Sequence, residues 1–341
     1  MPQIEIEEGL GSIVGASDSM RRLYRQVEEA GPSAAPVLIV GETGTGKELV
    51  ARTLHRLSAR KSRPYVAVNC AAMPESLVES ELFGHEKGAF TGASTRSVGY
   101  FEQAHRGTLF LDEISAMPVS QQAKLLRVVQ EGTIRRLGSG TEMTVDARVI
   151  GAMNADPGKE MEEGRLRSDL YYRLSVFVIE VPPLRERPGD AVILARRFAS
   201  EFAKAQGRCP PLIDAEASMA LDRYSWPGNV RELRNVIERG VILSRNDRIT
   251  PDELPATLSQ TSPPVGERKE PSAPTPSVEV AFPGMTVEEV KRRLIVRTLE
   301  ATGSISEAAR KLGISSRTIY NKIHEWNLSP ESFSNGRVCG Q

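Results

Sequence analysis

The stretch that most constrains the fold of this chain is VLIVGETGTGKE, residues 37–48. Four apolar residues predict a short buried strand, a glycine-rich turn follows, and apolar residues at helical spacing come after Lys47. Glycines let successive backbone N–H groups surround an anion, and the start of a helix adds its positive dipole end. Because Lys47 would reach the outer phosphates of a nucleoside triphosphate, the turn indicates a phosphate-binding loop rather than a plain connection. The residues that we expect to bind ATP here are Gly41, Glu42, Thr43, Gly44, Thr45, Gly46, Lys47 and Glu48.

One position in this loop departs from the usual pattern. The residue after the lysine is commonly a Ser or Thr whose hydroxyl contacts Mg²⁺, but here it is Glu48. Thr43, Thr45 and a later carboxylate are therefore the candidates for holding the metal. The sequence leaves the choice among them open.

Composition limits what the rest of the molecule can be. The chain has 341 residues, enough for two or three domains, and its 44 basic and 44 acidic side chains cancel. A DNA-binding surface must therefore be local. The three cysteines and four histidines are scattered, and no window is typical of a signal peptide or a membrane span. These features predict a cytoplasmic protein with no zinc site, no disulfide framework and no membrane contact.

Two further apolar runs end in polar residues that suit catalysis. Residues 65–68 predict a strand followed by Asn69, and residues 107–111 predict a strand followed by Asp112 and Glu113. Beside a phosphate loop, Asp112 would hold Mg²⁺, and Glu113 would orient or deprotonate the attacking water. The alternative for the acidic pair is a helix N-cap after a strand, which the upstream phosphate loop disfavours. We therefore count Asn69, Asp112 and Glu113 as candidate catalytic residues.

The segment between these strands contains GHEKGAFTGA, residues 84–93. Its glycines make it a poor helix and a poor strand, which alone indicates a mobile surface loop. Together with GETGTGKE and GTLFLDE, however, it closely resembles the AAA+ ATPase domain of sigma-54 dependent transcriptional activators. In that family the GAFTGA loop contacts the sigma factor of RNA polymerase. The residues to which the resemblance gives this contact are Gly88, Ala89, Phe90, Thr91, Gly92 and Ala93.

The resemblance implies further residues of a nucleotide site. Asn154 follows a predicted strand where the family has a nucleotide-sensing polar residue, although Met153 replaces the hydroxyl residue often found beside it. Arg167 and Arg173 match the segment that supplies arginine fingers to the neighbouring subunit. A guanidinium suits this task because it stays charged and stabilises charge spreading over the transferring phosphoryl group. The alternative for Arg167 is a solvated surface pair with Asp169.

A helical subdomain is predicted to follow residue 182. Within its WPGNVREL segment, Asn229 is expected to cap a helix, and the Glu232 side chain is expected to accept a hydrogen bond from the backbone N–H of Asn229. Arg231 falls in the first helical turn, where a cation opposes the helix dipole. The family uses this arginine as a second sensor that contacts bound nucleotide.

The composition changes in the last quarter of the chain, from residue 255 onward. Residues 255–283 are rich in Pro, Ser and Thr without an apolar period, which predicts a flexible linker. Beyond it, amphipathic segments around a glycine turn predict a helix-turn-helix, with Leu294 among its apolar residues and Ala309 at the crossing. An ordinary helical hairpin is the alternative, but the segment resembles the Fis-type DNA-binding domain that ends this family's chains. The expected DNA contacts are Ser316, Arg317, Thr318, Tyr320, Asn321 and Lys322.

We therefore predict an α/β fold with an AAA+ P-loop core and a parallel sheet, an all-α lid, and a C-terminal all-α helix-turn-helix domain. The expected boundaries are a short extension at 1–12, the core at 13–182, the lid at 183–254, the linker at 255–283, the DNA-binding domain at 284–328 and a tail at 329–341.

The predicted function is ATP-dependent activation of sigma-54 RNA polymerase. The protein would bind double-stranded enhancer DNA, assemble into a homo-oligomeric ring, a hexamer when active, and couple Mg²⁺-dependent ATP hydrolysis to promoter opening through residues 88–93. One alternative is a DNA-binding regulator whose ATPase fold is only structural, and another is a replication-initiator ATPase. The intact phosphate loop and GAFTGA argue against them. Since twelve residues precede residue 13, we expect control by a trans-acting inhibitor protein or by abundance rather than by a sensory domain.

Overall fold

The computed structural model describes residues 9–154, 156–244, 247–259, 287–302, 304–312 and 316–326. The chain forms two compact units, Met1–Pro264 and Val265–Gln341. Most of the predicted linker and the predicted C-terminal tail lie outside the described residues. Within those residues, no helix has the length and apolar character needed to cross a bilayer.

The first unit is built on a parallel sheet of five strands. These are β3 (Val37–Val40), β4 (Tyr65–Asn69), β5 (Thr108–Asp112), β8 (Arg148–Met153) and β9 (Phe177–Glu180). Their order across the sheet is β4-β5-β8-β3-β9. The central strand β8 is buried along its whole length, which explains its apolar run. Parallel pairing brings the carboxyl ends of the strands to one edge, so the turn after β3 lies on the same side as the end of β5.

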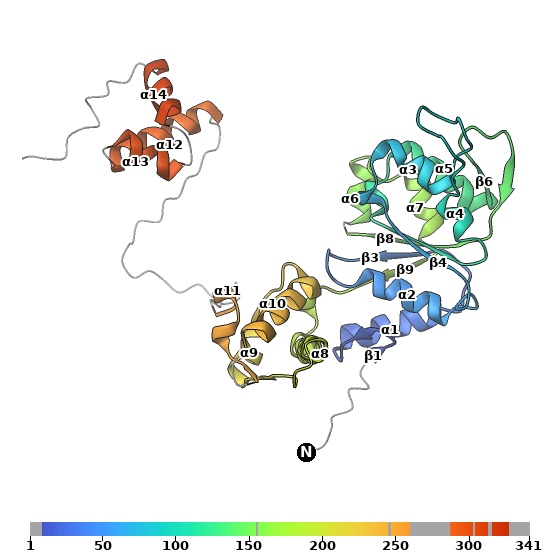
Figure 1. Ribbon diagram of the computed structural model, residues 1–341, viewed down its shortest axis with the longest axis horizontal. Coiled ribbons are helices and arrows are strands. Elements are labelled where there is room, and N and C mark those ends of the chain that lie inside the picture. Colours follow the sequence, from blue (N-terminus) through green and yellow to red (C-terminus); the bar gives the residue numbers. More distant parts are fainter. Residues whose placement is uncertain are drawn as a thin grey trace, which may run out of the picture. The chain divides into compact units, whose positions relative to one another are not determined.

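Helices cover both faces of this sheet (Figure 1). They are α1 (Asp18–Ala30), α2 (Lys47–Leu57), α3 (Glu75–Phe83), α4 (Tyr100–Gln103), α5 (Val119–Glu131), α6 (Pro157–Glu162) and α7 (Ser168–Leu174). Alternate residues of each strand serve opposite faces. Ile39 and Phe110 pack in the cluster with α1 and α2, whereas Leu38 and Leu109 pack in the cluster with α3, α4, α5 and α7.

Short elements complete this core. A hairpin of β1 (Gly9–Leu10) and β2 (Ile13–Val14) shows that ordered structure starts before the predicted boundary at residue 13. A second hairpin, β6 (Thr133–Arg135) with β7 (Glu142–Thr144), follows α5. The 3-10 turns are η1 (Cys70–Ala72), η2 (Ile114–Ala116), η3 (Leu184–Glu186) and η4 (Pro251–Glu253).

A buried arginine ties the end of α1 to the sheet. The Arg148 guanidinium donates to the carbonyl oxygens of Gly31 at 2.8 Å, Ala30 at 2.8 Å and Ala35 at 3.3 Å. These carbonyls lie at and just beyond a helix C-terminus, where backbone acceptors lack partners within the helix. Arg148 is only 2% exposed, and this burial lowers the pKa of its guanidinium to about 10. The side chain therefore acts as a C-terminal cap supplied from a different element.

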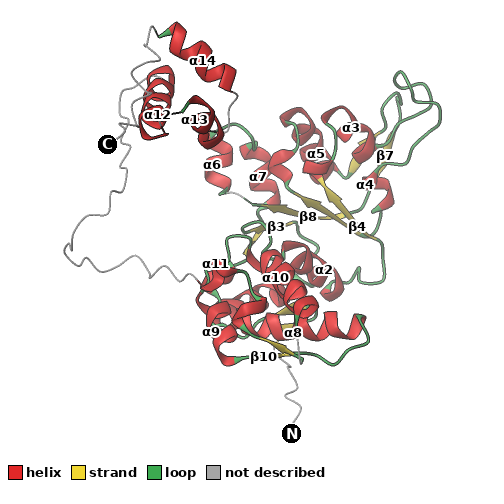
Figure 2. Ribbon diagram, turned by 60° about the vertical axis from the view of Figure 1, so that its left-hand side comes forward, coloured by secondary structure: helices red, strands yellow, loops and turns green. Residues whose placement is uncertain are grey.

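The rest of the first unit is a lid, almost entirely helical (Figure 2). It comprises α8 (Asp190–Ala205), α9 (Ala215–Arg223), α10 (Asn229–Leu243), α11 (Ala256–Ser259) and a parallel pair, β10 (Leu212–Ile213) with β11 (Arg248–Ile249). The predicted start of the linker at residue 255 is wrong, because α11 continues the fold to Ser259. Leu258 of α11 is 3% exposed and packs in the lid core. The sequence did not show this helix, because one large apolar residue is too few to reveal a helical periodicity.

The second unit contains α12 (Val287–Thr302), α13 (Ile305–Leu312) and α14 (Ser316–Glu325). Its buried residues include Leu299, Ala309 and Ile319, so the predicted crossing at Ala309 is buried as expected. Leu294, one of the apolar residues that indicated an amphipathic segment, is 56% exposed, and its neighbour Ile295 is buried instead. The predicted α/β fold with a helical lid and an all-α C-terminal domain is confirmed.

Candidate nucleotide site and its neighbouring loops

The glycine-rich turn connects β3 to α2. Gly44 and Gly46 have φ values of 81° and 101°, a region in which side-chain-bearing residues are strained, so glycine is needed at both positions. The helix that follows begins at Lys47 and has no side-chain cap, so its first N–H groups face the turn. The geometry is that of an anion-binding helix N-terminus.

Lys47 turns back into this loop. Its Nζ donates to the carbonyl oxygens of Gly41 at 2.7 Å and Glu42 at 3.1 Å, and to the side-chain oxygen of Asn154. Burial lowers the pKa of Lys47, while the nearby carboxylates of Asp112 and Glu113 act in the opposite direction. A buried cation beside two acids is therefore held at the centre of the loop.

The candidate catalytic carboxylates stand at the carboxyl end of β5. Asn69 lies opposite Asp112 in the β4–β5 register, and its Oδ1 accepts from the N–H groups of Ala71 and Ala72. Glu113 has a left-handed backbone with φ of 57°, a conformation that side-chain-bearing residues adopt at a cost and that clusters at functional sites. Burial raises the pKa of Asp112, and burial together with Asp112 raises the pKa of Glu113.

Asn154 joins the cation to the acid. It follows the last residue of β8, and its side-chain nitrogen donates to Glu113 Oε1 while its oxygen accepts from Lys47. The amide therefore distinguishes its two neighbours by charge. The structure thus brings Lys47, Asp112, Glu113 and Asn154 together from three strand ends.

The remaining loop side chains differ in their surroundings. Glu48 points along α2 and pairs with Arg52 at 2.8 Å, one helical turn later. The Thr45 hydroxyl is buried and donates to the carbonyl of Glu42 at 2.8 Å, whereas Thr43 is exposed. Among the described residues, no group of three acidic, His or Cys side chains could hold a metal ion alone.

Three arginines are among the lid residues that contact the loop. Glu42 pairs with Arg185 at 2.6 Å, the N–H of Arg231 donates to the Gly44 carbonyl at 3.3 Å, and the Arg187 guanidinium donates to the Thr45 carbonyl at 3.2 Å. The prediction that Asn229 caps α10 is wrong by one position. Gly228 is the N-cap, and its N–H donates to Glu232 Oε2 at 2.8 Å.

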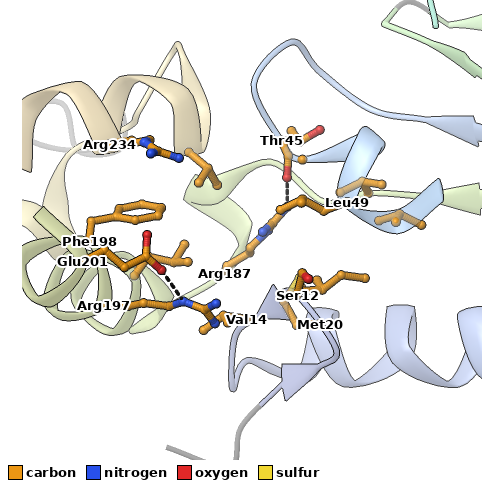
Figure 3. A pocket seen from close by; sticks show the side chains of 16 residues that line it. Ser12, Val14, Met20, Thr45, Leu49, Arg187, Arg197, Phe198, Glu201 and Arg234 are labelled. Carbon is orange, nitrogen blue, oxygen red and sulfur yellow. Dashed lines mark hydrogen bonds and ion pairs between the residues drawn. The ribbon is translucent and has the colours of Figure 1, made fainter. Parts of the chain in front are cut away.

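A cavity of about 200 Å³ opens between the loop and the lid. Its walls are largely apolar, from Val14, Leu49 and Phe198, and Figure 3 shows these side chains facing the same space as Thr45. Arg197 and Glu201 pair at 3.0 Å on one side of it. The guanidinium of Arg234 also lines the cavity, 5.8 Å from the ring centroid of Phe198. An apolar lining with a few polar side chains is of the kind expected of a small-ligand site.

The two arginines proposed as fingers are exposed at the ends of α7. Arg167 pairs with Asp169 at 2.7 Å, as expected if it only forms a surface ion pair. Arg173 donates to the Val129 carbonyl at 3.5 Å. Both side chains therefore bond to residues near α7 and not to the phosphate loop of the same chain.

The GAFTGA segment forms a closed turn. The N–H of Gly88 donates to the Ala93 carbonyl at 2.8 Å, and that of Ala93 donates to the Phe90 carbonyl at 3.0 Å. Phe90 is 39% exposed and packs its ring edge against His85, while Thr91 is exposed. The two predicted tip residues therefore face solvent.

The loop that contains Arg136 and Gly138 lies against the GAFTGA segment. The Arg136 guanidinium, 7% exposed, donates to Glu86 at 2.8 Å and to Glu102 at 2.6 Å. A side chain at Gly138 would lie 2.9 Å from the Cβ of Ala89, so the loops are in close contact. Sequence reasoning missed Arg136, because only its position next to residues distant in the chain distinguishes it from Arg135.

The proposed DNA-contacting residues all lie on α14. Thr318, Tyr320 and Asn321 are exposed, and Lys322 lies 5.5 Å from the ring centroid of Trp326. Ser316 and Arg317 begin the helix, and their side chains lie outside the described part of the structure. This helix presents polar and basic residue types of the kind that bind phosphates and base edges.

Known protein families match three successive parts of this chain. Residues 13–180 match the sigma-54 interaction domain, residues 185–271 the AAA+ ATPase lid domain, and residues 286–326 the Fis family of bacterial regulatory proteins. The regulatory protein LuxO of Vibrio cholerae is 44% identical over 92% of this chain and 69% of its own length. The chain belongs to the family of sigma-54 dependent transcriptional activators.

Other sigma-54 activators match to a similar degree. The formate hydrogenlyase transcriptional activator FhlA of Escherichia coli is 45% identical over 93% of this chain, which spans only 44% of the FhlA length. The crystal structure of NtrX from Brucella abortus in complex with ADP superposes with a TM-score of 0.68 at 35% identity. That match covers 93% of this chain and 70% of the NtrX chain. A second NtrX structure contains ATP and superposes with a TM-score of 0.67.

Within this sigma-54 activator, sequence reasoning found the polar residues but not the apolar cavity. Val14, Leu49 and Phe198 come from three separate elements, and each resembles an ordinary core residue in the sequence. No sequence pattern marks them, because the exposure of Leu49, 42%, is visible only in the folded chain.

Proposed function

We propose that this protein is an ATP-hydrolysing activator of sigma-54 RNA polymerase that binds enhancer DNA and works as a ring. The observation that carries the proposal is the linked set of Lys47, Asn154 and Glu113 at the phosphate loop, in the same domain as an intact GAFTGA turn. This set joins the group expected to bind phosphate to the group expected to activate water.

ATP would span the loop and the cavity. The phosphates would occupy the helix N-terminus at Gly41–Glu48, where backbone N–H groups and Lys47 supply positive charge. The base would enter the apolar cavity beside Leu49 and Phe198. Arg231 would reach the phosphates from the lid, since its backbone is already bonded to Gly44.

The residues present fit a magnesium ion bound together with ATP. Such an ion takes one or two carboxylates and completes its octahedron with phosphate oxygens and water. Asp112 is the carboxylate at the strand end beside Lys47, whereas Glu48 is engaged with Arg52. When bound, the ion would neutralise charge on the phosphates. We assign Asp112 as its protein ligand.

Hydrolysis would combine groups from two copies of the chain. Glu113 would orient or deprotonate the water that attacks the γ-phosphate, with Asn69 beside the acidic pair in the sheet register. Arg167 and Arg173, exposed on α7, would enter the site of the next protomer and stabilise the transferring phosphoryl group. This division of labour is what makes us propose a ring, hexameric when active.

The output would be delivered by two surfaces. Phe90 and Thr91 at the tip of residues 88–93 would contact the sigma factor, and α14 would bind double-stranded enhancer DNA. Because the chain spans less than half of FhlA, these partners are proposed for the region present in this sequence.

The enzymatic claim is tested with purified protein and the Glu113→Gln variant. The wild type is expected to hydrolyse ATP, and the variant to retain nucleotide binding while losing turnover by about a hundredfold or more. Glu75→Gln, the same change at an exposed position of α3, is the matched control and should keep wild-type activity. Unchanged turnover in Glu113→Gln would contradict the assignment. Promoter opening without any nucleotide would favour a regulator whose ATPase fold is only structural.

A further inference from the structure

Asn229 is a fully buried amide at the junction of three segments. Its Oδ1 accepts from the N–H of Leu184 at 2.8 Å, at the start of the lid. Its Nδ2 donates to Glu42 Oε2 and to the Thr43 carbonyl, both at 3.1 Å, in the phosphate loop. The same residue begins α10, the helix that carries Arg231.

The chemistry of this site requires an amide. The N–H of Leu184 demands an acceptor, which fixes the oxygen end of the side chain, and the two acceptors in the loop then require both hydrogens of Nδ2. The backbone of Asn229 is left-handed with φ of 52°, a conformation that Asn adopts more readily than other side-chain-bearing residues. Both the side chain and the backbone therefore select asparagine.

The phosphate loop and the turn before α10 also pack closely against each other. A Cβ added at Gly44 would lie 2.4 Å from the carbonyl oxygen of Gly228, so the loop and the turn before α10 touch backbone to backbone. The N–H of Arg231 donates to Gly44 at 3.3 Å. Arg185, and after it Asn229, lower the pKa of Glu42 to about 2, so the carboxylate facing the amide is ionised at neutral pH.

We propose that Asn229 is a positioning residue that locks the phosphate loop to α10 and so sets the place of Arg231 over the bound nucleotide. The proposal rests on the proposed binding of ATP at this loop. It assigns to one amide the coupling between occupancy of the loop and the position of the lid. Asn229 itself would touch neither ATP nor the metal ion.

The isosteric Asn229→Asp variant tests the amide directly. It keeps the acceptor for Leu184 but places a carboxylate against ionised Glu42 and against the Thr43 carbonyl, so the lock should open. In the full chain, we expect the dissociation constant for a non-hydrolysable ATP analogue with Mg²⁺, measured by calorimetry, to rise by about tenfold or more. Gln26→Glu, the same chemical change at an exposed position of α1, should bind as the wild type does.

Two double variants separate positioning from general stability. In the double variant Glu42→Gln with Asn229→Asp, the new amide at position 42 can donate to the new carboxylate at position 229. This variant should recover at least part of the lost affinity for the ATP analogue. Adding Asn229→Asp to Arg231→Ala should weaken binding less than it does in the wild type, because an effect exerted through Arg231 disappears with that side chain.

The outcomes distinguish this proposal from the proposed function. If the wild type binds the analogue and Asn229→Asp binds it equally well, the positioning role is refuted while ATP binding stands. Additive effects with Arg231→Ala, or no recovery in the Glu42→Gln double variant, would also refute it. If Asn229→Asp and its Glu42→Gln double variant both fail to fold, Asn229 is purely structural and the proposal fails. A wild type that binds no nucleotide would instead overturn the proposed function.

Discussion

The backbone N–H of Arg167 donates to the side-chain oxygen of Gln122 at 3.0 Å. Gln122 is fully buried in α5, and its nitrogen donates to the carbonyls of Met117 at 2.9 Å and Arg165 at 2.7 Å. The backbone before α7 is thus fixed from inside the domain, while the guanidinium of Arg167 stays at the surface beside Asp169. A rigid backbone that presents an exposed cation suits a group that acts on a neighbouring molecule.

If Arg167 acts on the next protomer, two inactive variants should complement each other. Lys47→Ala lacks the phosphate-binding cation but keeps its finger, whereas Arg167→Ala keeps the loop. We expect each alone to lose turnover, Arg167→Ala by roughly a thousandfold, and their mixture to recover measurable ATP hydrolysis. If the mixture stays inactive although light scattering shows that rings assemble, Arg167 does not act on the nucleotide site of the next protomer.

The tip of the GAFTGA turn should be separable from the chemistry. Thr91→Ala removes an exposed hydroxyl that belongs neither to the phosphate loop nor to the carboxylates at the end of β5. We expect ATP hydrolysis to remain within about twofold of the wild type and sigma-54 dependent transcription to fall by about tenfold or more. Thr95→Ala, an exposed threonine just outside the motif, is the matched control. Full activation by Thr91→Ala would remove this residue from the sigma contact.

The sequence predicts the elements of this fold better than the contacts between them. The strand ends, the phosphate loop and the helix starts are local patterns, so Lys47 and Asp112 could be placed from them. Asn154 was placed only through the resemblance to the family. Asn229 was assigned to a cap because local sequence cannot show that Glu42 lies beside it. Helical spacing likewise counted Leu294 among the apolar residues of its segment, and only the packing shows that Ile295 is the buried one.

The Arg148 cap should be a major contribution to the stability of the core. Arg148→Met keeps much of the side-chain volume but leaves the carbonyls of Gly31, Ala30 and Ala35 without this donor. We expect a loss of about 3 kcal/mol in the free energy of unfolding, measured with urea. Arg135→Met, which breaks only an exposed pair with Glu142, should change it by less than about 1 kcal/mol. Equal effects would show that the buried bonds to α1 add nothing.

The pair of Glu160 with Arg165 should give the fold a dependence on acid. Arg165 holds the pKa of Glu160 below its ordinary value of 4.5. A carboxylate with a lowered pKa in the folded state stabilises the fold above pH 4.5, and this contribution is lost as the pH falls through the folded pKa. The melting temperature of the wild type should therefore exceed that of Glu160→Gln at neutral pH, and the difference should shrink below pH 4.5. A difference that is constant with pH would contradict this account.

The most direct test asks whether energy from the nucleotide site reaches the promoter. Purified protein is mixed with sigma-54 RNA polymerase and promoter DNA carrying its upstream site, and strand opening is measured with ATP or with a non-hydrolysable analogue. We predict open complexes with ATP and none above background with the analogue. Equal opening with the analogue would show that hydrolysis at Glu113 is not coupled to the Phe90–Thr91 tip.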